Sequence, residues 1–156
     1  MQAVILTAGE GTRMRPLTLT RPKTMLPIAG KPILQYNIEA LRENGIKDIL
    51  MITGYHESKV KEYFKNGDKF NVNIRYHTQK EQLGTANAIK YARKHVEDEF
   101  IVLNGDIITE PATITDLLSH HKKADTTIVL REVEDPSQFG VVKLKEDNIK
   151  DIIEKP

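Results

Sequence analysis

A glycine-rich, strongly basic segment follows the first apolar run of this chain. Gly9 and Gly11 come directly after that run, and glycine can adopt backbone angles that bring its amide groups close to a ligand. Between positions 8 and 32 there are five basic residues against one acidic residue: Arg13, Arg15, Arg21, Lys23 and Lys31 against Glu10. The whole chain carries a net charge of only +1. Positive charge concentrated in one loop favours a compact anion, such as a triphosphate, over a nucleic-acid backbone.

The segment does not match the two most familiar phosphate-binding motifs. A P-loop requires Ser or Thr after Gly-Lys, but Pro32 follows the only Gly-Lys pair of the chain. A dinucleotide-binding fingerprint requires a third glycine soon after the second, and none follows Gly11. Four of the seven prolines fall in this segment and stiffen a connection much longer than an ordinary loop. A long, stiff and charged loop indicates a binding site rather than a simple turn.

A carboxylate follows another apolar run. Residues 100–103 read Phe-Ile-Val-Leu, and Asp106 comes three positions later, after Asn104 and Gly105. If this run is a strand parallel to the first, its carboxyl end lies at the edge where the Gly9 loop emerges. Mg²⁺ commonly binds one or two carboxylates together with substrate phosphates, so Asp106 is a candidate metal ligand. A tight turn in which Asp106 caps the residues that follow is an equally good interpretation of Asn-Gly-Asp.

The elements that position these residues are strands and helices, which alternate along the chain. Helical spacing of apolar residues predicts helices over 34–41, 60–64, 85–92 and 114–121. Apolar runs predict strands over 3–6, 49–52, 72–76, 100–103 and 126–130, and a hairpin that joins 141–145 to 149–153. Strands separated by helices favour an α/β fold with a mostly parallel sheet covered on both faces.

Composition limits the class of protein. The chain has 156 residues, of which 39% are hydrophobic, so it is long enough to bury the core of a single domain. The absence of cysteine excludes disulfides, thiolate nucleophiles and cysteine zinc sites. No apolar run approaches the roughly 18 residues of a membrane span, and the start lacks the features of a signal peptide. We therefore expect a cytoplasmic protein that binds neither membrane nor nucleic acid, and a homo-oligomer is compatible with the sequence.

Over residues 1–156 the sequence resembles the sugar-nucleotide pyrophosphorylases, which are sugar-1-phosphate nucleotidyltransferases. Their signature of an apolar strand, a Gly-x-Gly-Thr-Arg loop and a later Pro-Lys matches residues 9–13 and 22–23. Their base-recognition segment resembles residues 79–86, and their sugar-binding segments resemble 139–142 and 154–156. The resemblance implies a three-layer Rossmann-like fold with a mostly parallel mixed sheet. It also implies one nucleotidyltransferase domain, whose nucleotide-binding part is followed by the start of the sugar-binding part.

The resemblance also implies a role for each matching residue. Arg13 would stabilise the pyrophosphate, Lys23 would bridge the reacting phosphates, and Asp106 would bind Mg²⁺. The implied nucleotide-binding residues are Leu6, Ala8, Gly9, Gly11, Thr12, Gln79, Gly84 and Thr85. The implied residues for the sugar phosphate are Gly140, Glu154 and Lys155.

The implied reaction joins a nucleoside triphosphate to a sugar 1-phosphate and releases pyrophosphate. Ala8 stands where many members that use dTTP have glycine, so the expected nucleotide is UTP or dTTP with a preference for UTP. The second metal-binding aspartate of the family lies beyond Pro156, and we therefore expect a chain that is incomplete at its C-terminus. A catalytically silent, nucleotide-binding subunit is the alternative function. Cytidylyl transfer to an alcohol phosphate is disfavoured by Gly140 and Glu154.

Overall fold

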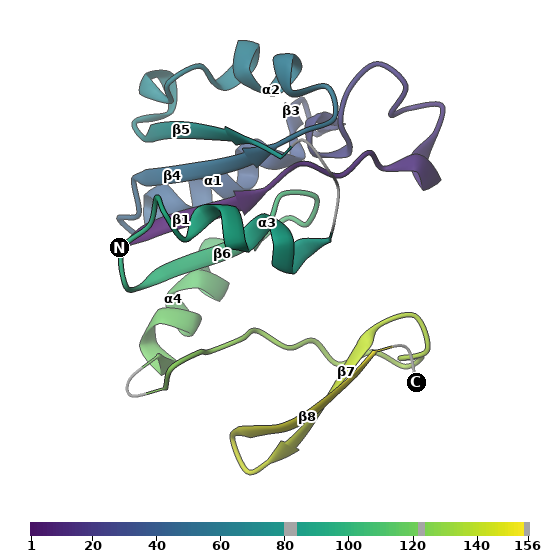
Figure 1. Cartoon of the computed structure of the whole chain (residues 1–156), viewed down its shortest axis with the longest axis vertical. Helices are drawn as coiled ribbons and strands as arrows, with labels where there is room; N and C mark the ends of the chain where they lie inside the picture. The colour runs from purple at the N-terminus through teal and green to yellow at the C-terminus, as the bar shows by residue number, and fades with distance from the viewer. Residues whose placement is uncertain (80–83, 122–123, 155–156) are drawn as a thin grey trace. The chain divides into compact units, whose positions relative to one another are not determined.

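The computed structural model describes residues 1–79, 84–121 and 124–154 (Figure 1). The chain forms two compact units, Met1–Ala124 and Asp125–Pro156. The first unit holds all the helices among the described residues, and the second holds a β-hairpin. Among the described helices, none combines the length and the apolarity that crossing a membrane requires.

The first unit is built on a four-stranded sheet in the order β5-β4-β1-β6. All three pairings in this sheet are parallel, so the four strands have their carboxyl ends at one edge. The strands are β1 (Gln2–Leu6), β4 (Asp48–Thr53), β5 (Asn73–Thr78) and β6 (Phe100–Asn104). They confirm the four strands predicted over 3–6, 49–52, 72–76 and 100–103. Antiparallel pairing occurs in separate two-stranded ribbons, the first formed by β2 (Pro27–Ile28) and β3 (Lys31–Pro32).

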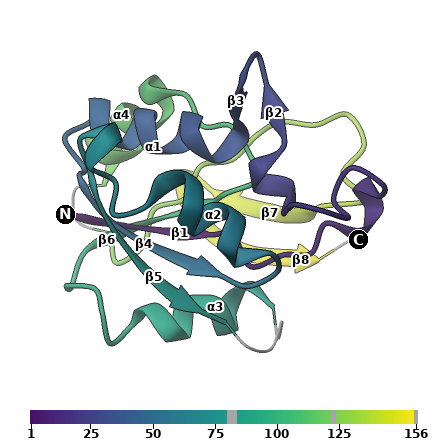
Figure 2. The same ribbon diagram turned by 90° about the horizontal axis from the view of Figure 1, so that it is seen from above.

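Helices cover both faces of this sheet, as the sequence predicts. They are α1 (Ile33–Glu43), α2 (Glu57–Phe64), α3 (Thr85–Ala92) and α4 (Pro111–His120). Figure 2 shows α1 and α4 on one side of the strands and α3 on the other. The side chains of β1 alternate accordingly, because Ala3 and Ile5 pack in the cluster that contains residues of α1, α2 and α4. Val4 packs in a second cluster with Ala88 and Ala92 of α3.

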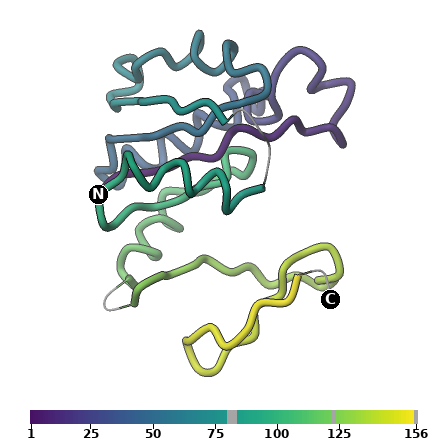
Figure 3. The backbone as a smooth tube through the Cα atoms, viewed as in Figure 1, coloured from purple at the N-terminus to yellow at the C-terminus, as the bar shows by residue number. Residues whose placement is uncertain are grey.

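Between β1 and α1 the backbone makes a long excursion beyond the carboxyl end of the sheet (Figure 3). Two short 3₁₀ turns interrupt it, η1 (Thr12–Met14) and η2 (Lys23–Met25); a third, η3 (Asp68–Phe70), follows α2. This excursion is the glycine-rich basic loop of the sequence. Because it leaves from the carboxyl end of a central parallel strand, it lies at the edge where α/β sheets bind ligands.

The second unit contains an antiparallel hairpin of β7 (Gly140–Lys145) and β8 (Asn148–Glu154), which confirms the predicted hairpin. The strand predicted over 126–130 is wrong, because these residues form no strand and Ile128, Val129 and Leu130 are 40–56% exposed. An apolar run becomes a strand only where a neighbouring strand pairs with it, and no described strand pairs with this run.

Candidate functional site

A cavity of about 530 Å³ opens at the carboxyl end of the sheet in the first unit. Nine of its lining residues were predicted from the sequence: Leu6, Ala8, Gly9, Gly11, Lys23, Gln79, Gly84, Thr85 and Asp106. Five others were not predicted: Thr7, Thr24, Ala88, Asn104 and Ile107. The lining comes from the ends of three strands, from η2 and from the start of α3. The predicted nucleotide and metal residues therefore meet mainly because parallel strands end at a common edge.

The first contact that shapes the cavity joins the ends of β1 and β6. Leu6 lies opposite Asn104 in the strand register, and the amide of Gly105 donates to the carbonyl of Leu6 over 2.9 Å. A Cβ on Gly105 would come within 2.9 Å of that carbonyl and of the Thr7 side chain. Glycine is therefore required here by lack of space, and the close approach places Asp106 beside the basic loop.

Lys23 and Asp106 form an ion pair inside the cavity. The Lys23 ammonium donates to Oδ2 of Asp106 over 2.9 Å, and both side chains are about one-third exposed, at 32% and 40%. Among the described residues no three His, Asp or Glu side chains form a metal cluster. Asp106 alone fits Mg²⁺, because a hard carboxylate oxygen in a phosphate-sized cavity is the kind of partial site that substrate phosphates complete.

Gly11 allows Lys23 to approach. It has a left-handed backbone with φ of 64°, and a Cβ added to it would lie 3.0 Å from Cβ of Lys23. Its carbonyl accepts a 2.9 Å hydrogen bond from the buried hydroxyl of Thr18. The sequence predicts that these glycines bring backbone amides close to a ligand. Gly11 in addition makes room for the packing of the loop.

The two other predicted residues of this loop lie outside the cavity lining. Thr12 and Arg13 belong to η1, and both side chains are exposed. Arg15 forms an ion pair with Glu10 within the loop. The positive charge of the segment is therefore divided, with Lys23 in the cavity and Arg13 at the exposed turn.

The loop is attached to the corner between β4 and α2. The Tyr55 hydroxyl donates to the carbonyl of Thr18 over 3.1 Å, and Nε2 of His56 lies 2.9 Å from the carbonyl of Leu19. The amide of Tyr55 donates to the carbonyl of Ala8 over 3.4 Å. His56 has a left-handed backbone with φ of 49°, which is uncommon for a residue with a side chain. These contacts hold the start and the middle of the glycine-rich basic loop.

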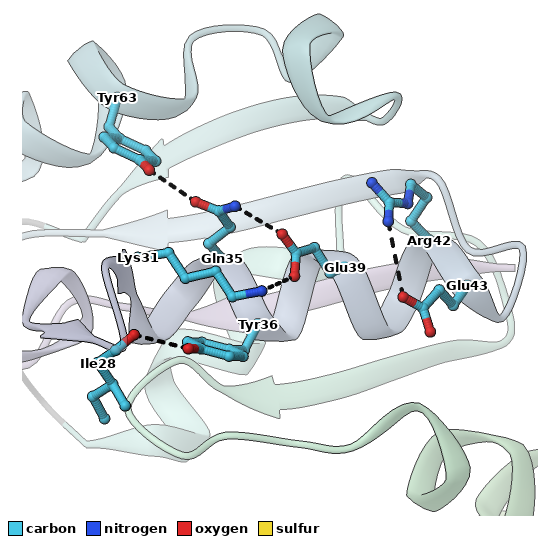
Figure 4. A network of polar contacts seen from close by, with 8 residues as sticks. All are labelled: Ile28, Lys31, Gln35, Tyr36, Glu39, Arg42, Glu43 and Tyr63. Atoms are coloured by element: carbon cyan, nitrogen blue, oxygen red, sulfur yellow. Dashed lines mark hydrogen bonds and ion pairs between the residues drawn. The ribbon is translucent and has the colours of Figure 1, made fainter.

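A polar network on α1 attaches the segment that follows η2 (Figure 4). Lys31 forms an ion pair with Glu39, and the Tyr36 hydroxyl donates to the carbonyl of Ile28 over 2.8 Å. Gln35 donates to Glu39 over 2.7 Å and accepts a 2.8 Å hydrogen bond from Tyr63 of α2. The β2–β3 hairpin is thereby anchored to α1, which is joined in turn to α2, and these contacts fix the chain just after Lys23.

Sequence analysis missed Asn37, a buried polar residue of α1. Its side chain is fully buried, donates to the carbonyl of Asn104 over 3.4 Å and accepts from the amide of Thr109 over 3.0 Å. It therefore holds both ends of the segment that carries Asp106. The available signal was a polar side chain within the apolar stripe of a helix, between Leu34 and Leu41.

Thr24 was also missed. Its hydroxyl is buried and has no hydrogen-bond partner among the described residues, although Thr24 lines the cavity next to Lys23. Nothing in the sequence distinguishes this threonine from the others in the loop.

Gln79 is held at the end of β5. It is 5% exposed, and its amide donates to the carbonyl of Thr53 over 2.7 Å. Nearby, Glu57 accepts hydrogen bonds from Thr53 and Thr78 over 2.9 and 2.6 Å, which joins the ends of β4 and β5. Burial raises the pKa of the Glu57 carboxyl, but hydrogen bonds from Thr78, Lys61 and Thr53 outweigh burial and hold that pKa below its ordinary value.

The other predicted residues of the base-recognition segment lie around the start of α3. Gly84 precedes the helix with φ of 91°, and Thr85 is its first residue. Residues 80–83 of this segment lie outside the described residues.

In the second unit, Gly140 and Glu154 are paired in the hairpin register. A Cβ on Gly140 would lie 3.1 Å from the Glu154 carboxylate. Lys155, the third residue predicted for the sugar phosphate, lies outside the described residues.

Known proteins match this chain over all or nearly all of its length. The model of the nucleotidyl transferase family matches residues 2–156. The chain is 46% identical over 157 residues to the bifunctional protein GlmU of Methanocaldococcus jannaschii, covering all of this chain and 36% of that protein. It is 40% identical over 165 residues to mannose-1-phosphate guanyltransferase of Schizosaccharomyces pombe, covering 45% of that protein. The chain thus spans less than half the length of these curated relatives.

Solved structures show the same fold. A structure described as a glucose-1-phosphate thymidylyltransferase from Bacillus anthracis has a TM-score of 0.88 and 29% identity, over all of this chain and 65% of that one. A UDP-glucose pyrophosphorylase solved with UDP-glucose has a TM-score of 0.76 and 27% identity, over 99% of this chain and 68% of that one. The Rossmann-like α/β fold predicted from the sequence is confirmed. The chain belongs to the nucleotidyl transferase family, which includes the sugar-nucleotide enzymes named among its relatives.

Proposed function

We propose that this protein transfers a nucleotidyl group from UTP or dTTP to a sugar 1-phosphate and releases pyrophosphate. The observation that carries the proposal is the Lys23–Asp106 pair, which places a cation and a potential metal ligand 2.9 Å apart in a cavity bordered by Gly9 and Gly11. Such a cavity suits a reaction between two phosphate anions, because binding and charge neutralisation are its main requirements.

Each residue has a role in this proposal. The backbone of Gly9 and Gly11 lies against the triphosphate. The Lys23 ammonium moves away from Asp106 and bridges the reacting phosphates. Arg13, on the exposed turn, binds the departing pyrophosphate. Mg²⁺ held by Asp106 would neutralise charge on the phosphates when it is bound. An oxygen of the sugar 1-phosphate attacks the α-phosphorus, the bond to the β-phosphate oxygen breaks, and pyrophosphate leaves.

No general base is required, because the attacking oxygen is already anionic at neutral pH. This agrees with the cavity lining, in which Asp106 is the one acidic side chain and histidine is absent among the described residues. In the proposal, Gly140, Glu154 and Lys155 bind the sugar phosphate. A cytoplasmic location fits substrates of such high charge.

Gln79 supports the choice of base. It lines the cavity with Gly84 and Thr85, where a base attached to a triphosphate in the glycine loop would be read. The names of the relatives mention guanyl, thymidylyl and UDP groups, whose bases all carry a ring N–H beside a carbonyl. Uracil and thymine share this feature with guanine, so it is compatible with UTP or dTTP without singling them out. Ala8 at the start of the loop favours UTP.

The test is a matrix of nucleoside triphosphates and sugar 1-phosphates with Mg²⁺, in which pyrophosphate release is measured. We expect release with UTP or dTTP and one class of sugar 1-phosphate. Lys23→Ala should abolish most of it, whereas Lys47→Ala, an exposed lysine outside the cavity, should not. Tight nucleotide binding without pyrophosphate release in any combination, both by this chain and by a longer protein that contains it, would instead establish the silent nucleotide-binding subunit.

A further inference from the structure

We propose that Asn87 is a positioning residue that fixes the side-chain amide of Gln79 and thereby selects bases with a ring N–H beside a carbonyl. Uracil, thymine and guanine form this class, and cytosine and adenine do not. The proposal rests on the proposed function, because it requires a nucleotide base in the cavity lined by Gln79.

The backbone around Gln79 is fixed on both sides of the contact. The amide of Gln79 donates to the carbonyl of Thr53 over 2.7 Å, which anchors the residue to the end of β4. Asn87 lies in the first turn of α3, and the next residue, Ala88, is 4% exposed and packs with Val4 and Ile52. The two residues are therefore held by separate elements, so their side chains meet in a defined geometry.

The side-chain contact gives the Gln79 amide a direction. Nε2 of Gln79 donates to Oδ1 of Asn87 over 3.3 Å. Oε1 of Gln79 receives no hydrogen bond from the part of the chain that the structure describes. Gln79 therefore presents one acceptor, Oε1, and the second hydrogen of Nε2 as a donor.

An acceptor beside a donor matches one class of base edge. Uracil and thymine present N3–H beside a carbonyl, and guanine presents N1–H beside its O6. Each can give its N–H to Oε1 and accept from Nε2. Cytosine and adenine present a ring nitrogen acceptor beside an exocyclic amino group, which is the reverse arrangement. They would require the Gln79 amide to turn over, which would place Oε1 against Oδ1 of Asn87 unless the Asn87 amide turned over with it.

Substitutions of Asn87 separate this role from general packing. Aspartate at position 87 can only accept, so it enforces the same direction of the Gln79 amide. Alanine keeps the helix but leaves the amide free to turn. Lys90→Ala, on the exposed side of the same helix and outside the cavity lining, is the matched control.

The experiment measures equilibrium binding of UMP, GMP, CMP and AMP to the chain by calorimetry. The original protein should bind UMP more tightly than CMP. Asn87→Ala should reduce the ratio of the two affinities by about fivefold, which is the effect expected from one hydrogen bond. Asn87→Asp should weaken all four nucleotides by charge repulsion but keep the ratio, and Lys90→Ala should change neither.

Other outcomes overturn the proposal in distinguishable ways. If Asn87→Ala leaves the ratio of the UMP and CMP affinities unchanged, Asn87 has no part in base selection. If Asn87→Asp lowers this ratio as much as Asn87→Ala does, the effect is one of packing. Equal binding of all four nucleotides by the original protein overturns the base selection but leaves the proposed function standing. Absence of binding by any of the four nucleotides overturns this inference, and pyrophosphate release from the triphosphates tests the proposed function separately.

Discussion

The Lys23 ammonium donates a 2.9 Å hydrogen bond to the Asp106 carboxylate, although 83 positions separate the two residues in the chain. Lys23 lies on η2 and Asp106 just beyond β6. The pairing of β1 with β6 and the close contact of Gly105 with Leu6 bring these two segments together. In the absence of other ions, each side chain neutralises the other. Under the proposed function, substrate phosphates and a metal ion would compete for the two groups of this pair.

The first prediction concerns this pair. Lys23→Ala should lower the rate of pyrophosphate release by roughly 10²–10³-fold, because one positive group aimed at the reacting phosphates is lost. The same substitution should strengthen binding of Mn²⁺ in the absence of nucleotide, since the ammonium no longer competes for Asp106. Calorimetry measures the second effect without any activity.

Lys47→Ala is the control, because Lys47 is exposed and does not line the cavity. It should leave both measurements unchanged. Normal turnover in Lys23→Ala would remove Lys23 from the proposed mechanism.

The second prediction concerns Asn37. Asn37→Ala leaves the carbonyl of Asn104 and the amide of Thr109 without their buried partner, which should lower the free energy of unfolding by about 2 kcal/mol. Urea denaturation measures this loss. Mn²⁺ binding should weaken in parallel, because the segment that carries Asp106 loses both of its attachments.

Asn73→Ala is the matched control. Asn73 also uses its side-chain amide, toward Asp48 over 3.0 Å, but it is exposed, and its loss should cost less than about 0.5 kcal/mol. Equal destabilisation by the two substitutions would contradict a special role for Asn37.

The third prediction concerns the attachment of the basic loop. Tyr55→Phe removes the hydrogen bond to the carbonyl of Thr18 and keeps the ring. We expect a loss of about 1 kcal/mol or less in stability and faster amide exchange in residues 11–20. The KM for the triphosphate should rise more than kcat falls, because binding must then order the loop.

Tyr63→Phe removes a comparable hydroxyl, which donates to Gln35 on the surface of the helices. It should leave exchange in residues 11–20 unchanged. Unaltered exchange in Tyr55→Phe itself would show that other contacts are sufficient to hold the loop.

The fourth prediction concerns pH and the network on α1. Burial raises the pKa of the Glu39 carboxyl, but hydrogen bonds from Lys31 and Gln35 and the charges of Lys31 and Arg42 outweigh it, so the pKa lies below the ordinary value of 4.5. A carboxyl with a lowered pKa in the folded state stabilises the protein above pH 4.5, and this contribution is lost as the pH falls through the folded pKa. The stability difference between the original protein and Glu39→Gln should therefore shrink below pH 4.5.

Glu43→Gln on the same helix provides the comparison. Glu43 is 54% exposed, and its carboxylate lies 3.9 Å from Arg42, so its substitution should have a small effect that changes little over this pH range (Figure 4). Urea denaturation at pH 3.5 to 7 measures both curves. Parallel curves for the two variants would show that the contacts of Glu39 with Lys31 and Gln35 add nothing to the free energy of unfolding.

Local patterns predicted the elements of the first unit well. The run 49–52 lies in β4, which is buried after its first residue and paired on both sides, and the spacing of Leu34, Ile38 and Leu41 gives α1, which ends before Gly45. Such patterns are reliable because burial repeats with the period of the element. The run 126–130 also contains three consecutive apolar residues, but strand formation depends on a partner from elsewhere in the chain.

The sequence by itself determined the chemistry that is available: a glycine-rich loop, a cluster of basic residues, a carboxylate after an apolar run and a glutamine after another. It also determined the α/β class, because alternation of strands and helices is written in local periodicity. Only the tertiary structure decided which side chains meet. Lys23 reaches Asp106 while Arg13 stays at an exposed turn, Asn37 contacts the segment that carries Asp106 from a helix outside the motifs, and Asn87 contacts Gln79. The reason is physical: contacts between distant residues follow from strand order and helix packing, which short-range spacing does not specify.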